Sequence, residues 1–238
     1  MVSICKKFGK KTVLEDVSIT VGPSEVVGLL GRDGAGKTVT FYSILGLLRV
    51  NAGHICLDGE DITALPLDQR ALRGLGYLPQ EASIFRGLTV EQNIMTVLEL
   101  FEPDPRLREE KLSELLDEFH IEYVRHVPAR ALSGGERRRC EIARAMAARP
   151  SIMLFDEPFA GIDPMSVRDI KAMIADLESH DVGILITDQN VREMIDLLDR
   201  VYVLHEGRIL FSGKPQDMLQ DKAVRHLYLG EAFHQTPR

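Results

Sequence analysis

Apolar and polar positions follow one another along this chain in a pattern that predicts strands separated by helices. Short continuous apolar runs bounded by turn residues are typical of strands buried on both faces of a parallel sheet. Such runs occupy residues 25–30, 152–155 and 183–187. Nearer the N-terminus, partial alternation over residues 13–21 predicts another strand, as does an apolar stretch at 54–57 before the turn signal Asp58-Gly59.

Helical spacing of apolar residues predicts the elements between these strands. Leu112, Leu115, Leu116 and Phe119 follow the i, i+3, i+4, i+7 pattern of one helix face, and a Pro103-Asp104-Pro105 break precedes them. The same kind of spacing recurs in three other segments. The expected helices are 37–48, 107–119, 136–148 and 165–177.

The order of these elements predicts an α/β fold. Strands that alternate with helices form a parallel sheet with crossover helices. Residues from about 90 to 148 are mostly helical in pattern, so we expect a helical subdomain inserted there. Residues 200–205 and 208–212 flank Glu206-Gly207 and predict a hairpin. Residues 1–238 are therefore expected to form one domain with a parallel core sheet, an antiparallel β subdomain and a helical subdomain.

Composition and charge narrow the classes of function. The chain has 238 residues, of which 45% are hydrophobic, and a formal net charge of −7. Proteins that bind nucleic acid usually carry a basic face, so we expect no nucleic-acid partner. The one dense basic cluster, Arg137-Arg138-Arg139, is typical of a solvated helix face.

Cysteine usage and apolar runs bear on the compartment. The three cysteines are far apart and none forms a C-x-x-C pair, which is typical of free thiols in a reducing compartment. The histidines lack metal-ligand spacing, so zinc is not expected. No apolar run approaches the ~20 residues that cross a bilayer, and no leader pattern is present. We therefore expect a cytoplasmic protein that reaches a membrane through a partner.

Residues 31–38 carry the strongest chemical signal. They read Gly-Arg-Asp-Gly-Ala-Gly-Lys-Thr, which is G-x-x-x-x-G-K-[ST] between a predicted strand and a predicted helix. The glycines let backbone N–H groups turn toward phosphate, the Lys37 ammonium reaches the β- and γ-phosphates, and the Thr38 hydroxyl holds Mg²⁺. The helix start adds the positive end of its dipole. The predicted ATP contacts here are Gly31, Arg32, Asp33, Gly34, Ala35, Gly36, Lys37, Thr38 and Val39.

An acidic pair, Asp156 and Glu157, follows the apolar run 152–155. Open α/β sheets bind their ligands at the carboxyl edge, where this pair is predicted to lie. Because the chain also has the phosphate loop of residues 31–38, we expect Asp156 to hold Mg²⁺, directly or through water, and Glu157 to polarise the attacking water. On its own, such a pair is more often a cap or a turn.

The segment Leu132-Ser-Gly-Gly-Glu136 predicts a second anion site. A serine hydroxyl and two glycines at a helix start bind phosphate well, although a simple helix cap uses the same residue types. Two copies arranged head to tail would pair each phosphate loop with the other copy's serine–glycine segment across a symmetric interface. The predicted contacts are Ser133, Gly134, Gly135 and Glu136.

Five motifs in this order resemble those of ABC transporter ATPase subunits, over nearly the whole chain. Besides the three segments above, they include Gln80 in Tyr77-Leu-Pro-Gln80 and Asp163 in Ala160-Gly-Ile-Asp163. The resemblance implies a nucleotide-sandwich homodimer that uses ATP and Mg²⁺ and is attached to two transmembrane permease subunits. It implies that Phe8 stacks on adenine, that Gln80 touches Mg²⁺ and the membrane partner, and that Asp163 communicates across the dimer. The alternative for Phe8 is a core aromatic.

Longer segments resemble the Lpt-type lipopolysaccharide-export ATPases. They are residues 77–86, 133–144, 156–164 and the tail 227–233. This resemblance implies a subunit peripheral on the cytoplasmic face of the bacterial inner membrane. Its ATP use would power the extraction of lipopolysaccharide and its export to the outer membrane, and the lipid itself would be handled indirectly. The competing group, ATPases of branched-chain amino-acid importers, shares the style of segment 61–66 but usually carries a glutamate and basic residues in place of Gln80-Glu-Ala-Ser.

Phe85 and Arg86 are the residues that the resemblance places in the groove for coupling helices of the membrane subunits. A core phenylalanine beside a surface arginine is the alternative. A soluble ABC-type ATPase acting on ribosomes or DNA is a different class of function. Such proteins usually have tandem ATPase halves or a long coiled-coil insert, and this chain has neither.

Three residues expected near the γ-phosphate depart from the family pattern. Asp33 would repel phosphate oxygens unless Arg32 or Mg²⁺ offsets its charge. Val39 replaces a threonine and removes a hydroxyl contact worth roughly 0.5–1.5 kcal/mol. Gln189, in Thr187-Asp-Gln-Asn, stands where the family has a switch histidine, and it donates a hydrogen bond without carrying a proton or charge. We expect Glu157 and Gln189 to be catalytic with slow turnover; a degenerate regulatory ATPase is the alternative.

Overall fold

A computed structural model describes residues 1–160, 164–189 and 191–229 of the chain. Its centre is a sheet with the strand order β11-β10-β3-β9-β8-β7. β11 runs antiparallel to β10, and the neighbouring pairs from β10 to β7 are parallel. The predicted α/β fold with a parallel core sheet is therefore confirmed. The strands are β3 (Val26–Leu30), β7 (Leu75–Leu78), β8 (Ile152–Asp156), β9 (Gly183–Thr187), β10 (Arg200–His205) and β11 (Arg208–Gly213).

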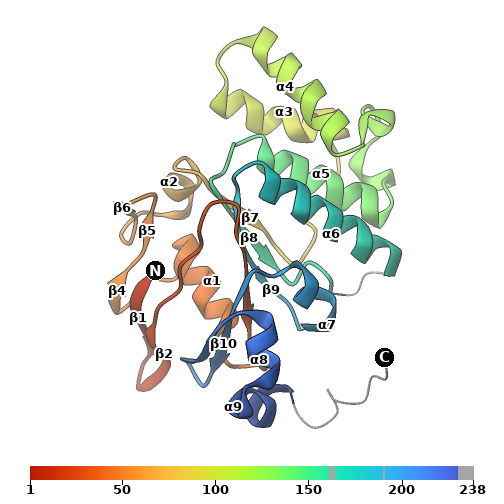
Figure 1. Cartoon of the computed structure of the whole chain (residues 1–238). Coiled ribbons are helices and arrows are strands. Elements are labelled where there is room, and N and C mark those ends of the chain that lie inside the picture. The colour runs from red at the N-terminus through yellow and green to blue at the C-terminus, as the bar shows by residue number, and fades with distance from the viewer. Residues whose placement is uncertain (161–163, 190, 230–238) are drawn as a thin grey trace.

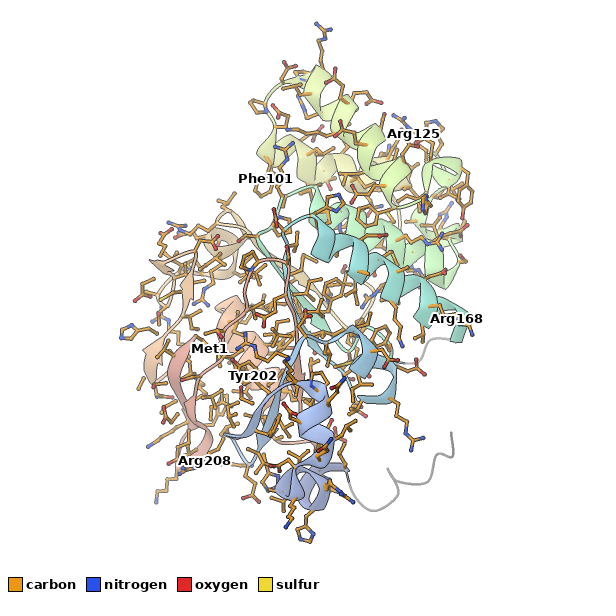
Figure 2. All side chains as sticks on the ribbon, viewed as in Figure 1. Met1, Phe101, Arg125, Arg168, Tyr202 and Arg208 are labelled. Atoms are coloured by element: carbon orange, nitrogen blue, oxygen red, sulfur yellow. The ribbon has the colours of Figure 1, made fainter. Side chains whose placement is uncertain are left out.

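Alternate residues of the central strands pack on opposite faces of this sheet. In β3, Val26 and Leu30 join the apolar cluster shared with the helical subdomain, whereas Val27 and Leu29 join the cluster on the other face. All five positions of β3 are buried, as are those of β9. This double burial explains why these strands read as continuous apolar runs. Figure 2 shows side chains filling the space on both sides of the sheet.

A smaller antiparallel layer covers one side of the core (Figure 1). Its strands are β1 (Val2–Phe8), β2 (Lys11–Val17), β4 (Ala52–His54), β5 (Cys56–Leu57) and β6 (Glu60–Asp61). The strand expected over residues 13–21 ends earlier, because beyond Val17 the backbone leaves the ladder and the Thr20 N–H donates to the Tyr202 hydroxyl at 3.2 Å. β1 and β7 were not predicted as strands.

The helices lie on both faces of the sheet. α1 (Lys37–Leu45) is shorter than the predicted 37–48, since Gly46 takes a left-handed conformation with φ of 78° and caps its C-terminus. The other helices outside the helical subdomain are α2 (Leu67–Ala71), α6 (Pro164–Ser179), α7 (Val191–Met194), α8 (Pro215–Gln220) and α9 (Lys222–Val224). In the part of the chain that the structure describes, no helix is long and apolar enough to traverse a bilayer.

The helical subdomain lies at the opposite end of the molecule from α8 and α9 (Figure 1). It contains α3 (Val90–Phe101), α4 (Pro105–Glu118) and α5 (Gly134–Met146), all of which lie between residues 90 and 148. Thr89 begins α3 with a reciprocal capping box, and Asp104 caps α4. The Arg125 guanidinium joins two of these helices by pairing with Glu91 at 2.8 Å and with Glu109. Figure 2 labels Arg125 at this end.

Candidate nucleotide-binding and catalytic site

Three segments distant in sequence meet at the carboxyl edge of the central sheet. β9 lies between β3 and β8 and is parallel to both, so the chain segments that leave the three strands are neighbours. Asp156 pairs in register with Thr187. One region is therefore surrounded by the phosphate loop after β3, the acidic pair at the end of β8 and the Thr187-Asp188-Gln189 segment. It lies at the carboxyl ends of the strands, where open α/β sheets bind their ligands.

The phosphate loop has room for no side chain at two of its glycines. A Cβ on Gly31 would lie 2.5 Å from the Leu204 carbonyl oxygen, and one on Gly36 would lie 2.8 Å from Leu14. Gly36 also has a φ of 115°, which side-chain-bearing residues rarely adopt. Glycine at these positions lets the loop curl closely over the sheet and deliver its N–H groups to one side.

Lys37 spans the phosphate loop from inside. Its side chain is only 7% exposed, and Nζ donates to the carbonyl oxygens of Gly31 at 2.7 Å and Arg32 at 3.3 Å. The ammonium is thus held within the curl where a phosphate would lie. Thr38 is exposed at the start of α1, and Val39 packs partly buried against the apolar cluster of the antiparallel side. Val39, which stands where the family pattern has a threonine, therefore contributes to apolar packing.

Arg32 and Asp33 are both exposed at the tip of the phosphate loop. Over the described ranges, no salt bridge joins Asp33 to Arg32. The ion pair by which Arg32 could offset the Asp33 charge is therefore not formed in this structure.

Glu157 is at the centre of the site and contacts two other predicted residues. Its φ is 45°, and its N–H donates to the Thr187 carbonyl at 2.7 Å, so the chain turns sharply as it leaves β8. Gln80 donates through Nε2 to Glu157 Oε2 at 2.9 Å, and Gln189 donates to Oε1 at 3.4 Å. The structure thus brings together Gln80, Glu157 and Gln189, which lie far apart in the sequence.

Asp156 lies beside Glu157 in a drier environment. Burial raises the pKa of its carboxyl, while the Tyr77 hydroxyl, which donates to Oδ2 at 3.3 Å, and the nearby Lys37 charge act in the opposite direction. Burial and the Asp156 charge in turn raise the pKa of Tyr77. Reasoning from sequence did not single out Tyr77 as a residue of the site, because only the β7–β8 register reveals the contact.

Oxygen donors suited to Mg²⁺ line this edge. Thr38 offers an exposed hydroxyl, and Asp156 a half-buried carboxylate. The Gln80 amide nitrogen is occupied by Glu157, which leaves its carbonyl oxygen as the free end of that side chain. Hydroxyl, carboxylate and amide oxygens are ligands that Mg²⁺ accepts. The residues present therefore fit the ion that the sequence implied.

The serine–glycine segment opens α5 with a reciprocal capping box. Ser133 is the N-cap, and its Oγ accepts from the Glu136 N–H at 3.3 Å, while Glu136 Oε2 accepts from the Ser133 N–H at 2.8 Å. The helix begins at Gly134 and not at Glu136 as expected. The capping box extends the helix by one half-turn, so Gly134 and Gly135 supply the first N–H groups of α5.

One face of α5 holds the segment that links β7 to α3. Arg138 donates to the Pro79 carbonyl at 3.0 Å, Glu141 accepts from the Ser83 N–H at 2.7 Å, and Arg144 donates to the Ser83 carbonyl at 3.0 Å. Glu141 is only 2% exposed. The interpretation of the arginine run as a solvated face is therefore wrong for Arg138, whose side chain is 11% exposed. The sequence signal for the contact between α5 and this segment was the spacing by three of Arg138, Glu141 and Arg144.

Phe85 and Arg86 lie exposed on that same segment. The Phe85 ring is 52% exposed and lies 4.9 Å below the Arg144 guanidinium. Its backbone N–H donates to Asn93 Oδ1 at 2.9 Å, and Asn93 is fully buried. Phe85 is thus an apolar surface residue in a fixed position, and the alternative of a core phenylalanine is wrong.

Phe8 ends β1 and is also exposed, at 48%. The Lys6 ammonium lies 4.8 Å from its ring centroid. A core aromatic is therefore wrong here as well, and one ring face remains a candidate for stacking. Asp163, predicted to communicate across a dimer, lies outside the described residues.

Comparison with known proteins agrees with this arrangement. The family model for ABC transporters matches residues 14–160 of the chain. The chain belongs to the ABC transporter family. Among its relatives, a probable ABC transporter ATP-binding protein from Azorhizobium caulinodans is 55% identical over 97% of this chain and 82% of its own length. The lipopolysaccharide export system ATP-binding protein LptB is 53% identical in Haemophilus influenzae and 51% in Escherichia coli, each over 97% of this chain and 96% of the relative.

Solved ABC transporter structures share the whole fold. The ADP conformation of an ATP-binding cassette of an ABC transporter aligns with a TM-score of 0.85 and 25% identity over 97% of both chains. A nucleotide-free cassette aligns with a TM-score of 0.84. The ABC family membership accounts for the phosphate loop, the serine–glycine segment and the acidic pair in a single ATP-binding chain.

Proposed function

We propose that this chain is the ATP-hydrolysing subunit of a transporter that extracts lipopolysaccharide from the inner membrane for export to the outer membrane. The observation that carries this proposal is the 50–53% identity to LptB proteins over 97% of the chain. The branched-chain amino-acid importer alternative has less support, because Gln80-Glu-Ala-Ser lacks that group's usual glutamate and basic residues. The proposed location is the cytoplasmic face of the inner membrane, through permease partners.

ATP binding is proposed to use the loop before and around α1. The loop N–H groups and the Lys37 ammonium meet the β- and γ-phosphates, and the exposed Phe8 ring stacks on adenine. Thr38, Gln80 and Asp156 would hold Mg²⁺, which when bound offsets the charge of the triphosphate. The carboxylate of Asp33 lies on the same loop and weakens this binding.

The complete site is proposed to need two copies of the chain. Within one chain, Ser133-Gly134-Gly135 caps a helix of the inserted subdomain, whereas Lys37 lies in the core. In a head-to-tail homodimer, the α5 N-terminus of one copy would meet the γ-phosphate held by the other. Because this contact exists only when the dimer is closed, ATP favours the closed form.

Hydrolysis is proposed to centre on Glu157. Gln80 and Gln189 each donate to one of its carboxylate oxygens, so the carboxylate is aimed by residues from two neighbouring segments. It would orient and polarise the water that attacks the γ-phosphate. Gln189 would also donate to that phosphate, where the family's histidine can carry a positive charge.

Replacing Gln189 by histidine is expected to raise ATP turnover by about fivefold. This corresponds to the ~1 kcal/mol by which a charge-assisted hydrogen bond exceeds a neutral one. Steady-state phosphate release from the complex with its membrane subunits measures the change. Turnover that stays at the parent rate, with the Gln189→Asn variant equally unaffected, would remove residue 189 from the catalytic step.

Coupling to the membrane subunits is proposed to run through residues 80–86. Gln80 contacts the catalytic carboxylate at one end of this segment, and the exposed Phe85 ring stands at the other. Arg138, Glu141 and Arg144 hold the segment to α5, the helix whose N-terminus would meet the partner's nucleotide. Closure of the dimer therefore moves the coupling surface together with the serine–glycine segment.

Phe85→Ala is expected to weaken binding of the membrane subunits by about 30-fold, because loss of a central aromatic anchor costs roughly 2 kcal/mol or more. The tagged chain is purified from membranes, and the amount of copurifying integral-membrane subunits is measured. Leu100→Ala is the control. Leu100 is an apolar residue that is 76% exposed, and it lies near the C-terminus of α3, whereas Phe85 contacts Asn93 near the N-terminus of that helix. Equal recovery with both variants would contradict the coupling role.

The transported substrate is tested with the same purified complex. Reconstituted into vesicles that contain lipopolysaccharide, it is expected to release the lipid to a soluble acceptor only when ATP is present. ATP-driven leucine uptake by these vesicles would favour the importer alternative. ATP binding without any turnover would favour the regulatory one.

A further inference from the structure

The Ser133 hydroxyl is already engaged within its own chain. Its oxygen lies 2.7 Å from Glu136 Oε2 and also accepts from the Glu136 N–H at 3.3 Å. Hydrogen bonds from the Ser133 side chain and backbone, and more weakly from Tyr123, lower the pKa of Glu136, so the carboxylate is ionised at neutral pH. An ionised carboxylate only accepts, so the single hydroxyl hydrogen of Ser133 is donated to Glu136.

This arrangement makes Glu136 a competitor of the nucleotide. A phosphate oxygen is also only an acceptor. The Ser133 hydroxyl therefore binds a partner's γ-phosphate only after it releases Glu136 Oε2. The free energy of closing the dimer includes the loss of that internal hydrogen bond, and it includes the repulsion between the Glu136 charge and the incoming phosphate.

Tyr123 supplies a third donor to the same carboxylate, after the hydroxyl and the N–H of Ser133. Its hydroxyl donates to Glu136 Oε1 at 2.9 Å. Ile121 and Val124 are buried on either side of it, which anchors this short turn, whereas Tyr123 itself is 69% exposed. The ring is not part of the core, so its placement is explained by the contact of its hydroxyl with Glu136.

We infer that Tyr123 is a positioning residue of the composite ATP site, the site that two copies of the chain form together. Tyr123 holds Glu136 so that the Ser133 hydroxyl can leave this carboxylate and donate to the γ-phosphate of the nucleotide bound by the other copy. The inference rests on the proposed function. With Tyr123 in place, Glu136 keeps two donors after the Ser133 hydroxyl turns away, namely the Ser133 N–H and the Tyr123 hydroxyl. Without it, one donor remains.

Two physical effects act in the same direction. Each donor draws negative charge from the carboxylate that the donors share, so the Ser133 hydroxyl is held less strongly when Tyr123 also donates. The Tyr123 hydroxyl also draws negative charge toward Oε1, the carboxylate oxygen that Ser133 does not contact. This shift reduces the repulsion between Glu136 and the incoming phosphate. The residue therefore changes how much ATP is needed to close the dimer and leaves the chemical step to Glu157.

The test is Tyr123→Phe, which keeps the exposed ring and removes only the hydroxyl. The apparent KM for ATP is expected to rise about three- to tenfold, the range for one lost hydrogen bond, while kcat at saturating ATP is preserved. In the Glu157→Gln background, the ATP concentration that gives half-maximal closed dimer is expected to rise by the same factor. An unchanged KM together with an unchanged dimerisation midpoint would overturn the inference.

A double-mutant cycle identifies Glu136 as the target. Glu136→Gln removes the charge that Tyr123 moderates, so adding Tyr123→Phe to it is expected to change KM by less than about twofold. The same full shift in both backgrounds would mean that Tyr123 acts elsewhere, and would also overturn the inference. Tyr202→Phe is the control, because it removes a hydroxyl that contacts Thr20 and Arg200, and Tyr202 packs in the apolar cluster on the opposite face of the sheet from the cluster that contains α5.

Ser133→Ala separates this inference from the proposed function. If Ser133→Ala leaves the ATP dependence of closure at the parent value, the composite site itself fails. If Ser133→Ala raises that ATP requirement and Tyr123→Phe does not, the composite site stands and only the role of Tyr123 is lost.

Discussion

Replacing Glu157 by glutamine is expected to lower steady-state ATP turnover by about 10²- to 10⁴-fold, the usual contribution of a positioned general base. Glutamine has the same shape but accepts no proton from the attacking water. Phosphate release from the complex with its membrane subunits measures the loss. Glu110→Gln is the matched control, since Glu110 is exposed on α4, outside the candidate site.

The same Glu157→Gln variant is expected to retain ATP and accumulate as a closed dimer, because binding and closure precede the step that it blocks. Size-exclusion chromatography with ATP and Mg²⁺ would detect the dimer. Two outcomes contradict the mechanism. Turnover at the parent rate removes Glu157 from its role, and a strictly monomeric variant, even beside its membrane subunits, rules out the shared nucleotide site.

Lys37→Ala is expected to raise the Kd for ATP by about 10- to 100-fold, since a hydrogen bond to a charged group contributes roughly 1.5–3 kcal/mol. Lys37 is buried in the curl of its loop, where its ammonium donates to the Gly31 carbonyl. Calorimetric titration gives the Kd directly. The stabilisation of the fold by ATP, measured as a shift of Tm, is expected to shrink in parallel.

Lys10→Ala provides the control for Lys37, because Lys10 is an exposed lysine in the turn between β1 and β2. It changes the net charge by the same amount without touching the phosphate loop. Equal ATP affinity of the two variants would show that the loop does not bind the triphosphate through Lys37. A lower Tm of Lys37→Ala without ATP is expected as well, because the Gly31 carbonyl loses its donor.

Elements with strong local signals were predicted well from the sequence. β3 and β9 are buried on both faces, so their apolar runs are continuous, and α4 follows a proline break with clear helical spacing. Weak local signals failed. β1 was missed, because its residues lie partly exposed in a small antiparallel layer and show little periodicity. α5 begins earlier than expected, because a capping box outweighed the low helix propensity of glycine.

The prediction of which groups meet the nucleotide came from residue types and spacing alone. The phosphate loop, the serine–glycine segment and the acidic pair are local patterns whose chemistry follows from residue type and spacing, so Lys37, Ser133 and Glu157 could be proposed without coordinates. The side chains that contact these segments became visible only in the folded chain. Gln80 on Glu157, Tyr77 on Asp156 and Tyr123 on Glu136 are long-range or surface contacts, created where strands pair or a turn packs against a helix. No local spacing encodes such contacts, because their geometry depends on packing between elements.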